Sequence, residues 1–210
     1  MNPGILRLLH LREQTEAAGE TMASERGRFA ALADPSAAPR VVSSFNLFQT
    51  PPALAERLAG YLLPVDGGIL EPSAGLGRLY RAIRDAGHAG PVVMVEQSPQ
   101  CCRELYELTV EDQHATLKQG DFLTRTAADL GGFFDGVIMN PPFKQWRDIK
   151  HIRHARTLLG PAGRLVSICA NGPRQRAALM DEATDWIDLP PGSFIEEGTH
   201  VNAAIVVVDA

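Results

Sequence analysis

Short β-rich runs alternate with helix-like segments over most of this 210-residue chain. Seven runs have the composition of strands: residues 67–70, 91–96, 115–120, 135–140, 163–170, 183–189 and 202–210. Helical patterns separate the early runs, which predicts parallel strands because a parallel connection has to cross over the sheet. The last two runs are joined by an irregular segment, so we expect an antiparallel final pair. The pattern predicts an α/β fold with a seven-stranded, mostly parallel sheet and helices on both faces.

The first 40 residues have a different character. Residues 4–33 carry apolar residues at helical spacing, and residues 33–40 (ADPSAAPR) break the pattern with two prolines, which is typical of a linker. We therefore expect an N-terminal helical arm with its linker over residues 1–40 and one larger domain over residues 41–210. That domain is predicted to begin with a helix in which Thr50 is the N-cap and Pro51 and Pro52 occupy the first turn.

Composition excludes several classes of protein. No apolar run approaches the roughly 18 residues of a membrane span, so we expect a cytoplasmic protein that does not enter a membrane. Three cysteines and six histidines have no metal-ligand or disulfide spacing, so no metal is expected. The net charge of −5 argues against a protein that coats nucleic acid through bulk positive charge. The net charge does not exclude a local basic patch.

A small-residue turn follows the first predicted strand. In EPSAGLG, Gly75 and Gly77 allow backbone conformations and close ligand approach that a Cβ atom would obstruct. Tyr80 stands where a dinucleotide fingerprint would have its third glycine, which weakens a nicotinamide interpretation. Glu71 adds a carboxylate beside the turn and suits a cationic or amine-bearing ligand. The alternative is a turn without a ligand.

Acidic residues end the next two predicted strands. Glu96 can accept hydrogen bonds from both ribose hydroxyls of an adenosine, and Asp121 with Phe122 could bond an adenine amine and cover its face. Each acid alone has a simpler interpretation as a solvated strand end. The ligands of open α/β sheets bind outside the carboxyl ends of the strands, so the series predicts one nucleoside-shaped crevice.

The fourth predicted strand ends on NPPF. Pro141 and Pro142 fix the backbone, so the Asn140 amide oxygen and the Pro141 carbonyl would form a stiff pair of acceptors. Such a pair can hold the two hydrogens of an exocyclic amine and localise its lone pair, while Phe143 stacks on a base that has left its helix. The alternative is a rigid turn with Phe143 in the core.

These motifs resemble the Rossmann-like (class I) S-adenosylmethionine-dependent methyltransferases, and within them amino-methyltransferases such as small bacterial and phage DNA N6-adenine enzymes. The resemblance spans about residues 45–210. It implies S-adenosylmethionine as cofactor and NPPF, residues Asn140, Pro141, Pro142 and Phe143, as the catalytic loop. The implied cofactor contacts are Phe48, Thr50, Glu71, Pro72, Ala74, Gly75, Gly77, Glu96, Gln97, Asp121 and Phe122.

The resemblance implies methyl transfer to adenine N6 in DNA as the first candidate activity. Phe143 stands where the DNA adenine enzymes more usually carry tyrosine, whereas phenylalanine occurs there in several RNA enzymes, and no target-recognition domain is evident. An RNA base or a protein glutamine therefore remains an alternative target. A cofactor-binding interaction protein without catalysis is a further alternative.

A basic helix is expected after NPPF, with Lys144, Arg147 and Lys150 as candidate nucleic acid contacts. Helical spacing places Arg147, Lys150, His151 and His154 on a face opposite Ile149 and Ile152. Arg174 and Arg176 follow the fifth predicted strand. The alternative for all of them is an ordinary solvated surface.

Overall fold

The computed structural model describes residues 49–210. The helices predicted within residues 4–33, the linker over residues 33–40 and the candidate Phe48 lie outside the described residues. Among residues 49–210, no helix combines the length and the apolar character that crossing a membrane requires.

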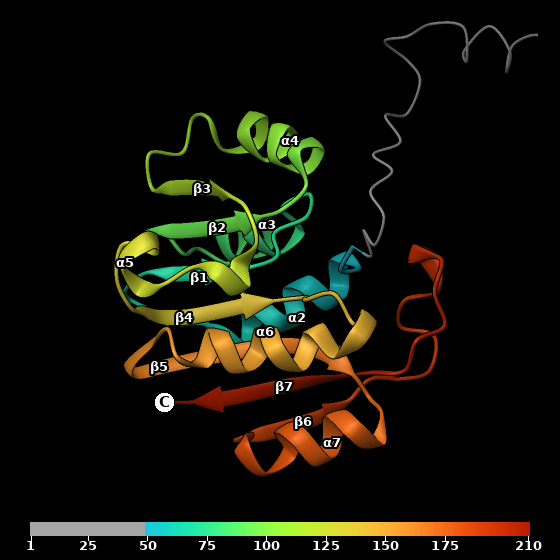
Figure 1. The fold of residues 1–210 in the computed structure, drawn as a ribbon. Coiled ribbons are helices and arrows are strands. Elements are labelled where there is room, and N and C mark those ends of the chain that lie inside the picture. Colours follow the sequence, from blue (N-terminus) through green and yellow to red (C-terminus); the bar gives the residue numbers. More distant parts are fainter. Residues whose placement is uncertain (1–48) are drawn as a thin grey trace, which may run out of the picture. The chain divides into compact units, whose positions relative to one another are not determined.

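One seven-stranded sheet forms the centre of the described chain, with the strand order β3-β2-β1-β4-β5-β7-β6 (Figure 1). Strands β1 to β5 pair in parallel, and β7 lies between β5 and β6 and runs antiparallel to both. The predicted mixed sheet with an antiparallel final pair is therefore confirmed. The strands are β1 (Ile69–Glu71), β2 (Val92–Glu96), β3 (Ala115–Gln119), β4 (Phe134–Met139), β5 (Leu159–Ala170), β6 (Asp185–Asp188) and β7 (Ala203–Asp209).

Helices cover both faces of the sheet, as predicted (Figure 1). Successive strand residues alternate between the two cores: Ile69 packs with one helical layer and Leu70 with the other. The first layer consists of α2 (Pro52–Leu62), α3 (Arg78–Asp85) and α4 (Pro99–Thr109). The second consists of α5 (Ala127–Leu130), α6 (Arg147–Arg156) and α7 (Pro173–Leu179). Short 3-10 turns are η1 (Phe122–Thr124), η2 (Lys144–Trp146), η3 (Met180–Glu182) and η4 (Ile195–Glu197).

Two helix starts show how proline sets a boundary. Ser98 caps α4, and its hydroxyl accepts a hydrogen bond from the Cys101 N–H at 3.4 Å. The prediction that Thr50 caps α2 is wrong, because the N-cap is Pro51, with an extended backbone. A residue that precedes a proline is held out of the helical region, so Pro52 moves the start of the helix one residue onward. This shift leaves the Thr50 hydroxyl available for another contact.

The direction of winding reverses between β1 and β4. From β1 the chain builds outward through β2 and β3, and from β4 it builds the opposite way through β5. In open α/β sheets the loops diverge at such a point and leave a crevice at the carboxyl ends of the strands. The loops after β1, β2, β3 and β4 carry the predicted motifs.

Candidate active site

A cavity of about 1200 Å³ opens at the carboxyl ends of β1, β2 and β4. Neither Gly77 nor Lys150 lines it. All the other predicted site residues within the described chain do, so the glycine turn and the NPPF segment border the same space. The lining includes Thr50, Glu71, Pro72, Ala74, Gly75, Glu96, Gln97, Asp121, Phe122, Asn140, Pro141, Pro142, Phe143, Lys144 and Arg147.

The turn between β1 and α3 needs its glycines for two different reasons. Gly75 and Gly77 have φ values of 55° and 75°, in the left-handed region that favours glycine. The Gly75 N–H donates to the Glu96 carboxylate at 2.8 Å, which joins the turn to the end of β2. A Cβ atom on Gly77 would lie 2.6 Å from Leu108 Cδ2 on α4. Gly77 therefore allows close packing against α4 and acts on the cavity only through the shape of the turn.

Glu96 is held firmly at the end of β2. One carboxylate oxygen accepts from Gly75 N–H, and the other accepts from Ser98 N–H at 2.7 Å. Each carboxylate oxygen has a second lone pair, so both can still accept a hydroxyl. Glu96 is thus fixed in position on the cavity wall and suited to bind a diol such as ribose.

Glu71 is a buried carboxylate with an unsatisfied oxygen. Its side chain is 1% exposed and lines the cavity, and Oε2 has no hydrogen-bond partner. Burial raises the pKa of Glu71 well above its usual value, a hydrogen bond from the Tyr80 backbone N–H lowers it in part, and the negative charge of Glu96 raises it further. Leaving a buried acceptor unpaired is costly, so this oxygen marks a position where a cationic or hydrogen-bond-donating ligand group would be stabilised.

Asp121 and Phe122 follow β3, but part of their bonding capacity is used within the protein. Asp121 accepts from the Leu123 N–H at 3.0 Å and forms an ion pair of 3.3 Å with Arg147. Phe122 is 2% exposed, and its ring packs against His151 and His154 with centroid distances of 5.5 and 4.8 Å. Arg147, predicted as a phosphate contact, therefore belongs to the cavity wall beside Asp121.

The NPPF segment lines the same cavity as the glycine turn. The Asn140 side-chain amide donates to the Thr50 hydroxyl at 3.2 Å, which fixes the orientation of the amide. Thr50 therefore orients Asn140, whereas the sequence predicts it as a cofactor contact. Phe143 is partly exposed: one side packs on the core beside α2 and α3, and the ring also lines the cavity. It is neither a fully buried core residue nor a freely exposed ring.

His151 is a site residue that the sequence placed incorrectly. Helical spacing put it on a solvent face opposite Ile149, but it is 4% exposed and lines the cavity, with its Nδ1 3.3 Å from the Ser73 hydroxyl. Burial lowers the pKa of His151 to about 4, and the charge of Arg147 contributes, so the imidazole is neutral at neutral pH. Its Nε2 has no hydrogen-bond partner. The inward face of α6 is broader than an apolar stripe indicates, because the buried Asp148 also lies on it.

Further wall residues come from segments that the sequence did not single out. The C-terminal segment before β7 contributes Phe194, Thr199 and Val201, and α4 contributes Gln100. Two wall residues could have been predicted from their position in the sequence. Ser73 lies inside the EPSAG turn, and Gln100 lies in the first helical turn after Glu96. The contribution of residues 194–201 could not be found by spacing, because it depends on β7 inserting between β5 and β6.

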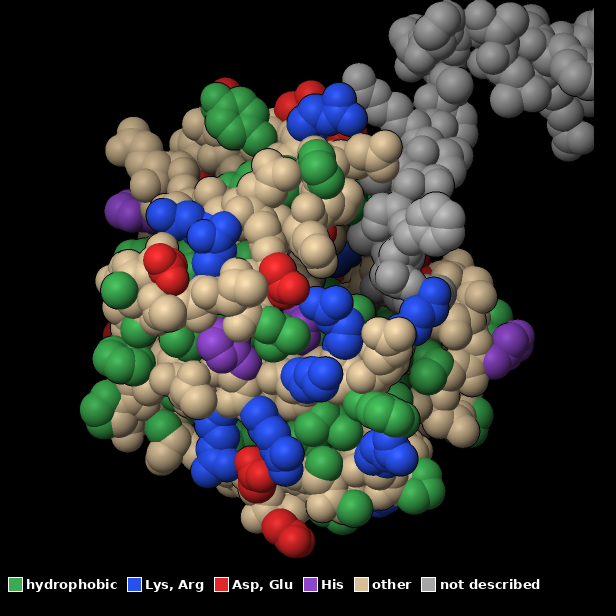
Figure 2. Space-filling model, in the orientation of Figure 1, with side chains coloured by type: hydrophobic (Ala, Val, Ile, Leu, Met, Phe, Trp, Pro, Cys, Tyr) green, Lys and Arg blue, Asp and Glu red, His purple; other side chains and the backbone are tan. Residues whose placement is uncertain are grey.

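The other basic residues serve different roles. Arg153 and Arg156 both form ion pairs with Glu182, at 3.2 and 2.7 Å, and Arg176 pairs with Asp188 at 2.7 Å. Lys144 and Lys150 are exposed. Figure 2 shows that Lys and Arg side chains gather on the face where α6 crosses the sheet. Within residues 49–210, no group of three or more His, Cys, Asp or Glu residues is arranged to hold a metal ion.

No protein-family model matches this sequence, and no curated protein sequence matches it. Solved structures do resemble it. A glycopeptide N-methyltransferase, MtfA, has a TM-score of 0.57 at 18% identity, over 77% of this chain and 91% of that one. An RNA methyltransferase from Salinibacter ruber, solved with S-adenosyl-L-homocysteine, has a TM-score of 0.55 at 17% identity, over 77% and 92% of the two chains.

The [4+2]-cyclase SpnF has a TM-score of 0.59 at 16% identity, over 75% of this chain and 80% of that one. A cyclase among methyltransferases illustrates that one fold supports several reactions, so the residues of the site determine the chemistry. At these identities the likenesses establish the architecture. The described chain has the Rossmann-like α/β fold of the class I S-adenosylmethionine-dependent methyltransferases.

Proposed function

We propose that this protein transfers a methyl group from S-adenosylmethionine to an exocyclic amino group of a nucleic acid base, with adenine N6 in DNA as the first candidate. The observation that carries the proposal is the shared cavity. Glu71, Gly75 and Glu96 line the same cavity as Asn140, Pro141 and Phe143. A nucleoside-sized ligand and an amine can therefore occupy one space.

The carboxylates that line the cavity suit this cofactor. The unsatisfied Oε2 of Glu71 fits an ammonium group, and the fixed carboxylate of Glu96 fits the two hydroxyls of a ribose. Asp121, which follows β3 and lines the cavity, would accept a hydrogen bond from an adenine amine. The cavity, about 1200 Å³, has room for the cofactor together with a base. When bound, S-adenosylmethionine would supply an electrophilic methyl group on a sulfonium.

The protein's own part of the chemistry is to position a nitrogen lone pair. An exocyclic amine is a poor nucleophile because its lone pair is delocalised into the ring. Two acceptors, the Asn140 amide oxygen and the Pro141 carbonyl, would hold both amine hydrogens and keep the lone pair on nitrogen. Thr50 fixes the amide orientation, and the two prolines fix the backbone. Phe143 offers one face to an unstacked base.

An RNA base is the second candidate target. Phe143 in place of tyrosine favours it, and one structural neighbour at 17% identity is an RNA methyltransferase. The acceptor pair suits any planar amine, so it does not separate the two polymers. A protein glutamine is a third candidate target for the same acceptors, and the experiment below would detect it as label in protein.

The test is to incubate the purified protein with S-adenosylmethionine labelled in its methyl group and with duplex DNA, single-stranded DNA and RNA, and then to identify the methylated nucleoside. We expect N6-methyladenine. Asn140→Ala should lower the rate about 100-fold or more, the range seen when a positioned polar group is removed, and should leave cofactor affinity within about threefold. Label in protein alone would contradict a nucleic acid target, and cofactor binding without turnover on any substrate would contradict catalysis.

A further inference from the structure

The segment that follows NPPF holds a tryptophan outward at the edge of the cavity. Trp146 is 52% exposed, whereas its neighbours Gln145 and Arg147 line the cavity. Gln145 and Trp146 have φ values of 56° and 57°, a conformation that residues with side chains seldom adopt. Two such residues in succession cost stability and persist only where the surroundings impose them. An exposed indole held in this way invites a functional explanation.

An arginine lies directly over this ring. The guanidinium carbon of Arg174, in the first turn of α7, is 3.7 Å from the centroid of the Trp146 ring. Among the described residues, Arg174 makes no ion pair, and its side chain is exposed. A guanidinium stacked on an indole keeps its charge and its outward N–H donors for an anion. The pair therefore offers an aromatic face together with a positive charge.

The chain contains a second pair of the same kind that serves as an internal comparison. Trp186 and Trp146 are its two tryptophans. Arg176 lies 5.5 Å from the centroid of the Trp186 ring, but it is ion-paired with Asp188, which also accepts from the Trp186 Nε1–H at 3.0 Å. That pair is neutralised and bonded within the protein. The pair at Trp146 has no such acidic partner.

The surroundings of Trp146 are positively charged. Lys144 and Lys150 are exposed near it in the chain, and Asp148, the nearest acid in sequence, is fully buried and bonded to Ala170 and Gln175. The face crossed by α6 is rich in Lys and Arg (Figure 2). This combination of an exposed aromatic ring and unneutralised cations is the one that proteins use to hold single nucleic acid strands.

We propose that Trp146 stacks on an unpaired base of the strand that carries the target nucleotide, while Arg174 binds the adjacent phosphate. The inference rests on the proposed function, because it names how that function's polymer substrate is held outside the cavity. The ring face not covered by Arg174 accepts the base, and Lys144 and Lys150 follow the backbone. A strand held at this edge would place the next nucleotide beside Phe143, which lines the cavity.

The two tryptophans allow a direct test with the full-length protein. The Trp186→Phe protein retains only Trp146, and the Trp146→Phe protein retains only Trp186. Each is titrated with an adenine-containing single-stranded DNA oligonucleotide, with RNA of the same sequence and with heparin, a polyanion without bases, while tryptophan fluorescence is recorded. We expect saturable quenching by an oligonucleotide in the Trp186→Phe protein, no quenching in the Trp146→Phe protein and no quenching by heparin.

Affinity provides an independent measurement. By fluorescence anisotropy of a labelled oligonucleotide, Trp146→Ala should weaken binding at least about fivefold, the lower end of what one base stack contributes. Arg174→Ala should weaken it several-fold and reduce its salt dependence, whereas Arg176→Ala, the matched control, should leave affinity unchanged. Both Trp146→Ala and Arg174→Ala should keep wild-type affinity for S-adenosylmethionine.

Several results would overturn the inference: no oligonucleotide binding, equal quenching of both single-tryptophan proteins, or quenching by heparin. These outcomes are separable from the failure of the proposed function. Binding and quenching at Trp146 without any methylated nucleoside would support the stacking site and reject the reaction. Methylation with wild-type efficiency by Trp146→Ala would support the reaction and reject the stacking site.

Discussion

Two carboxylates contact the same residue of helix α3, but they differ in hydrogen bonding and in the direction of their pKa shifts. Tyr80 donates its backbone N–H to Glu71, and its hydroxyl donates to Asp112 at 2.6 Å. Glu71 has an unsatisfied buried oxygen and a raised pKa. Asp112 accepts four interactions, and its pKa is lowered. One carboxylate faces the cavity, and the other joins loops at the amino ends of β2 and β3.

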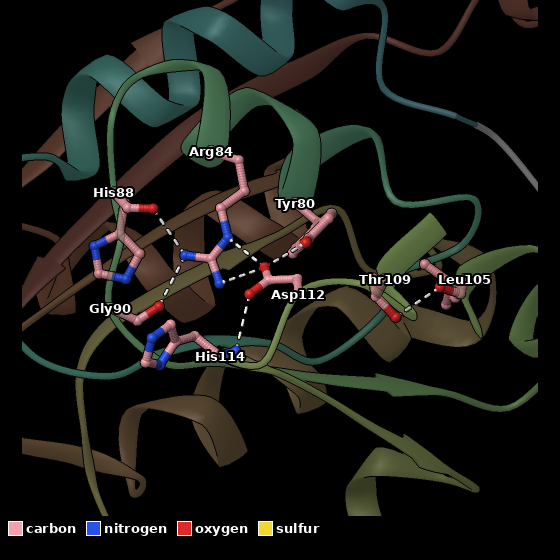
Figure 3. A network of polar contacts seen from close by, with 8 residues as sticks. All are labelled: Tyr80, Arg84, His88, Gly90, Leu105, Thr109, Asp112 and His114. Carbon is pink, nitrogen blue, oxygen red and sulfur yellow. Dashed lines mark hydrogen bonds and ion pairs between the residues drawn. The ribbon is translucent and has the colours of Figure 1, made fainter. Parts of the chain in front are cut away.

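Both oxygens of the Asp112 carboxylate accept hydrogen bonds within the protein (Figure 3). The Arg84 guanidinium lies between the Asp112 carboxylate, at 2.8 Å, and the carbonyls of His88 and Gly90, at 2.7 and 2.8 Å. The His114 N–H donates to the other Asp112 oxygen at 2.9 Å. Desolvation alone would raise the pKa of Asp112, but the hydrogen bonds from Tyr80 and His114 and the charge of Arg84 outweigh it.

The comparison separates structural polar groups from functional ones. Most buried polar groups that serve the fold are satisfied by the fold. A buried carboxylate that remains unsatisfied costs stability and is retained where a ligand completes it. We therefore infer that Glu71 exists for ligand binding and Asp112 for stability, and three substitutions test this difference.

The largest effect is expected for Glu71→Gln, which keeps the shape and removes the charge. Affinity for S-adenosylmethionine should fall about 10- to 100-fold, since a hydrogen bond to a charged group contributes about 1.5–3 kcal/mol. Isothermal titration calorimetry measures it, with Glu56→Gln on the exposed face of α2 as the matched control. Unchanged affinity would remove Glu71 from the site.

The wild-type protein and the Glu71→Gln variant should also differ in how their affinity for S-adenosylmethionine depends on pH. The pKa of Glu71 in the ligand-free protein is raised above its ordinary 4.5, and a cationic ligand needs the ionised form. Wild-type affinity should therefore rise with pH from about pH 5 until the raised pKa is passed, and the affinity of Glu71→Gln should not. In the same window the folded ligand-free protein binds more protons than the unfolded chain. Its unfolding free energy should therefore decline with rising pH relative to the variant.

A smaller effect, on stability alone, is expected for Asp112→Asn. It weakens an ion pair whose side chains are 18% and 23% exposed, so the free energy of unfolding should fall by about 1–2 kcal/mol. Because the pKa of Asp112 is lowered from 3.8, the difference should be complete above about pH 4 and shrink at lower pH. Chemical denaturation measures it, with the exposed Asp85→Asn as control. Cofactor affinity should stay within about twofold.

The smallest effect is expected for Tyr80→Phe, which tests whether the two regions are independent. The variant loses the hydroxyl that donates to Asp112 and keeps the backbone N–H that donates to Glu71. Unfolding free energy should fall by about 1 kcal/mol, the contribution of one hydrogen bond, with no change in cofactor affinity. A tenfold loss of affinity would mean that α3 couples the two carboxylates, and the comparison would no longer hold.

Much of the fold could be predicted because local patterns and global topology agree. All seven strands lie within or overlap the runs predicted as strands. Glu96, Asp121 and Asn140 meet at one edge because parallel strands place their carboxyl ends together. The prediction that Thr50 caps α2 was wrong because Pro52 holds Pro51 out of the helical region. The prediction that His151 lies on an outer face was wrong because the packing of α6 depends on residues distant in sequence.

The sequence by itself determined the order of strands and helices, the left-handed glycine turn and the stiff NPPF segment, since these follow from backbone preferences and periodicity that act within a few residues. Only the tertiary structure decided which polar groups have partners. It bonded Asp112 to α3, left a buried oxygen of Glu71 without a partner at the cavity wall, turned His151 inward and set Arg174 over Trp146. Whether a buried group is paired depends on atoms distant in sequence, so burial and hydrogen bonding become visible only when the chain is folded.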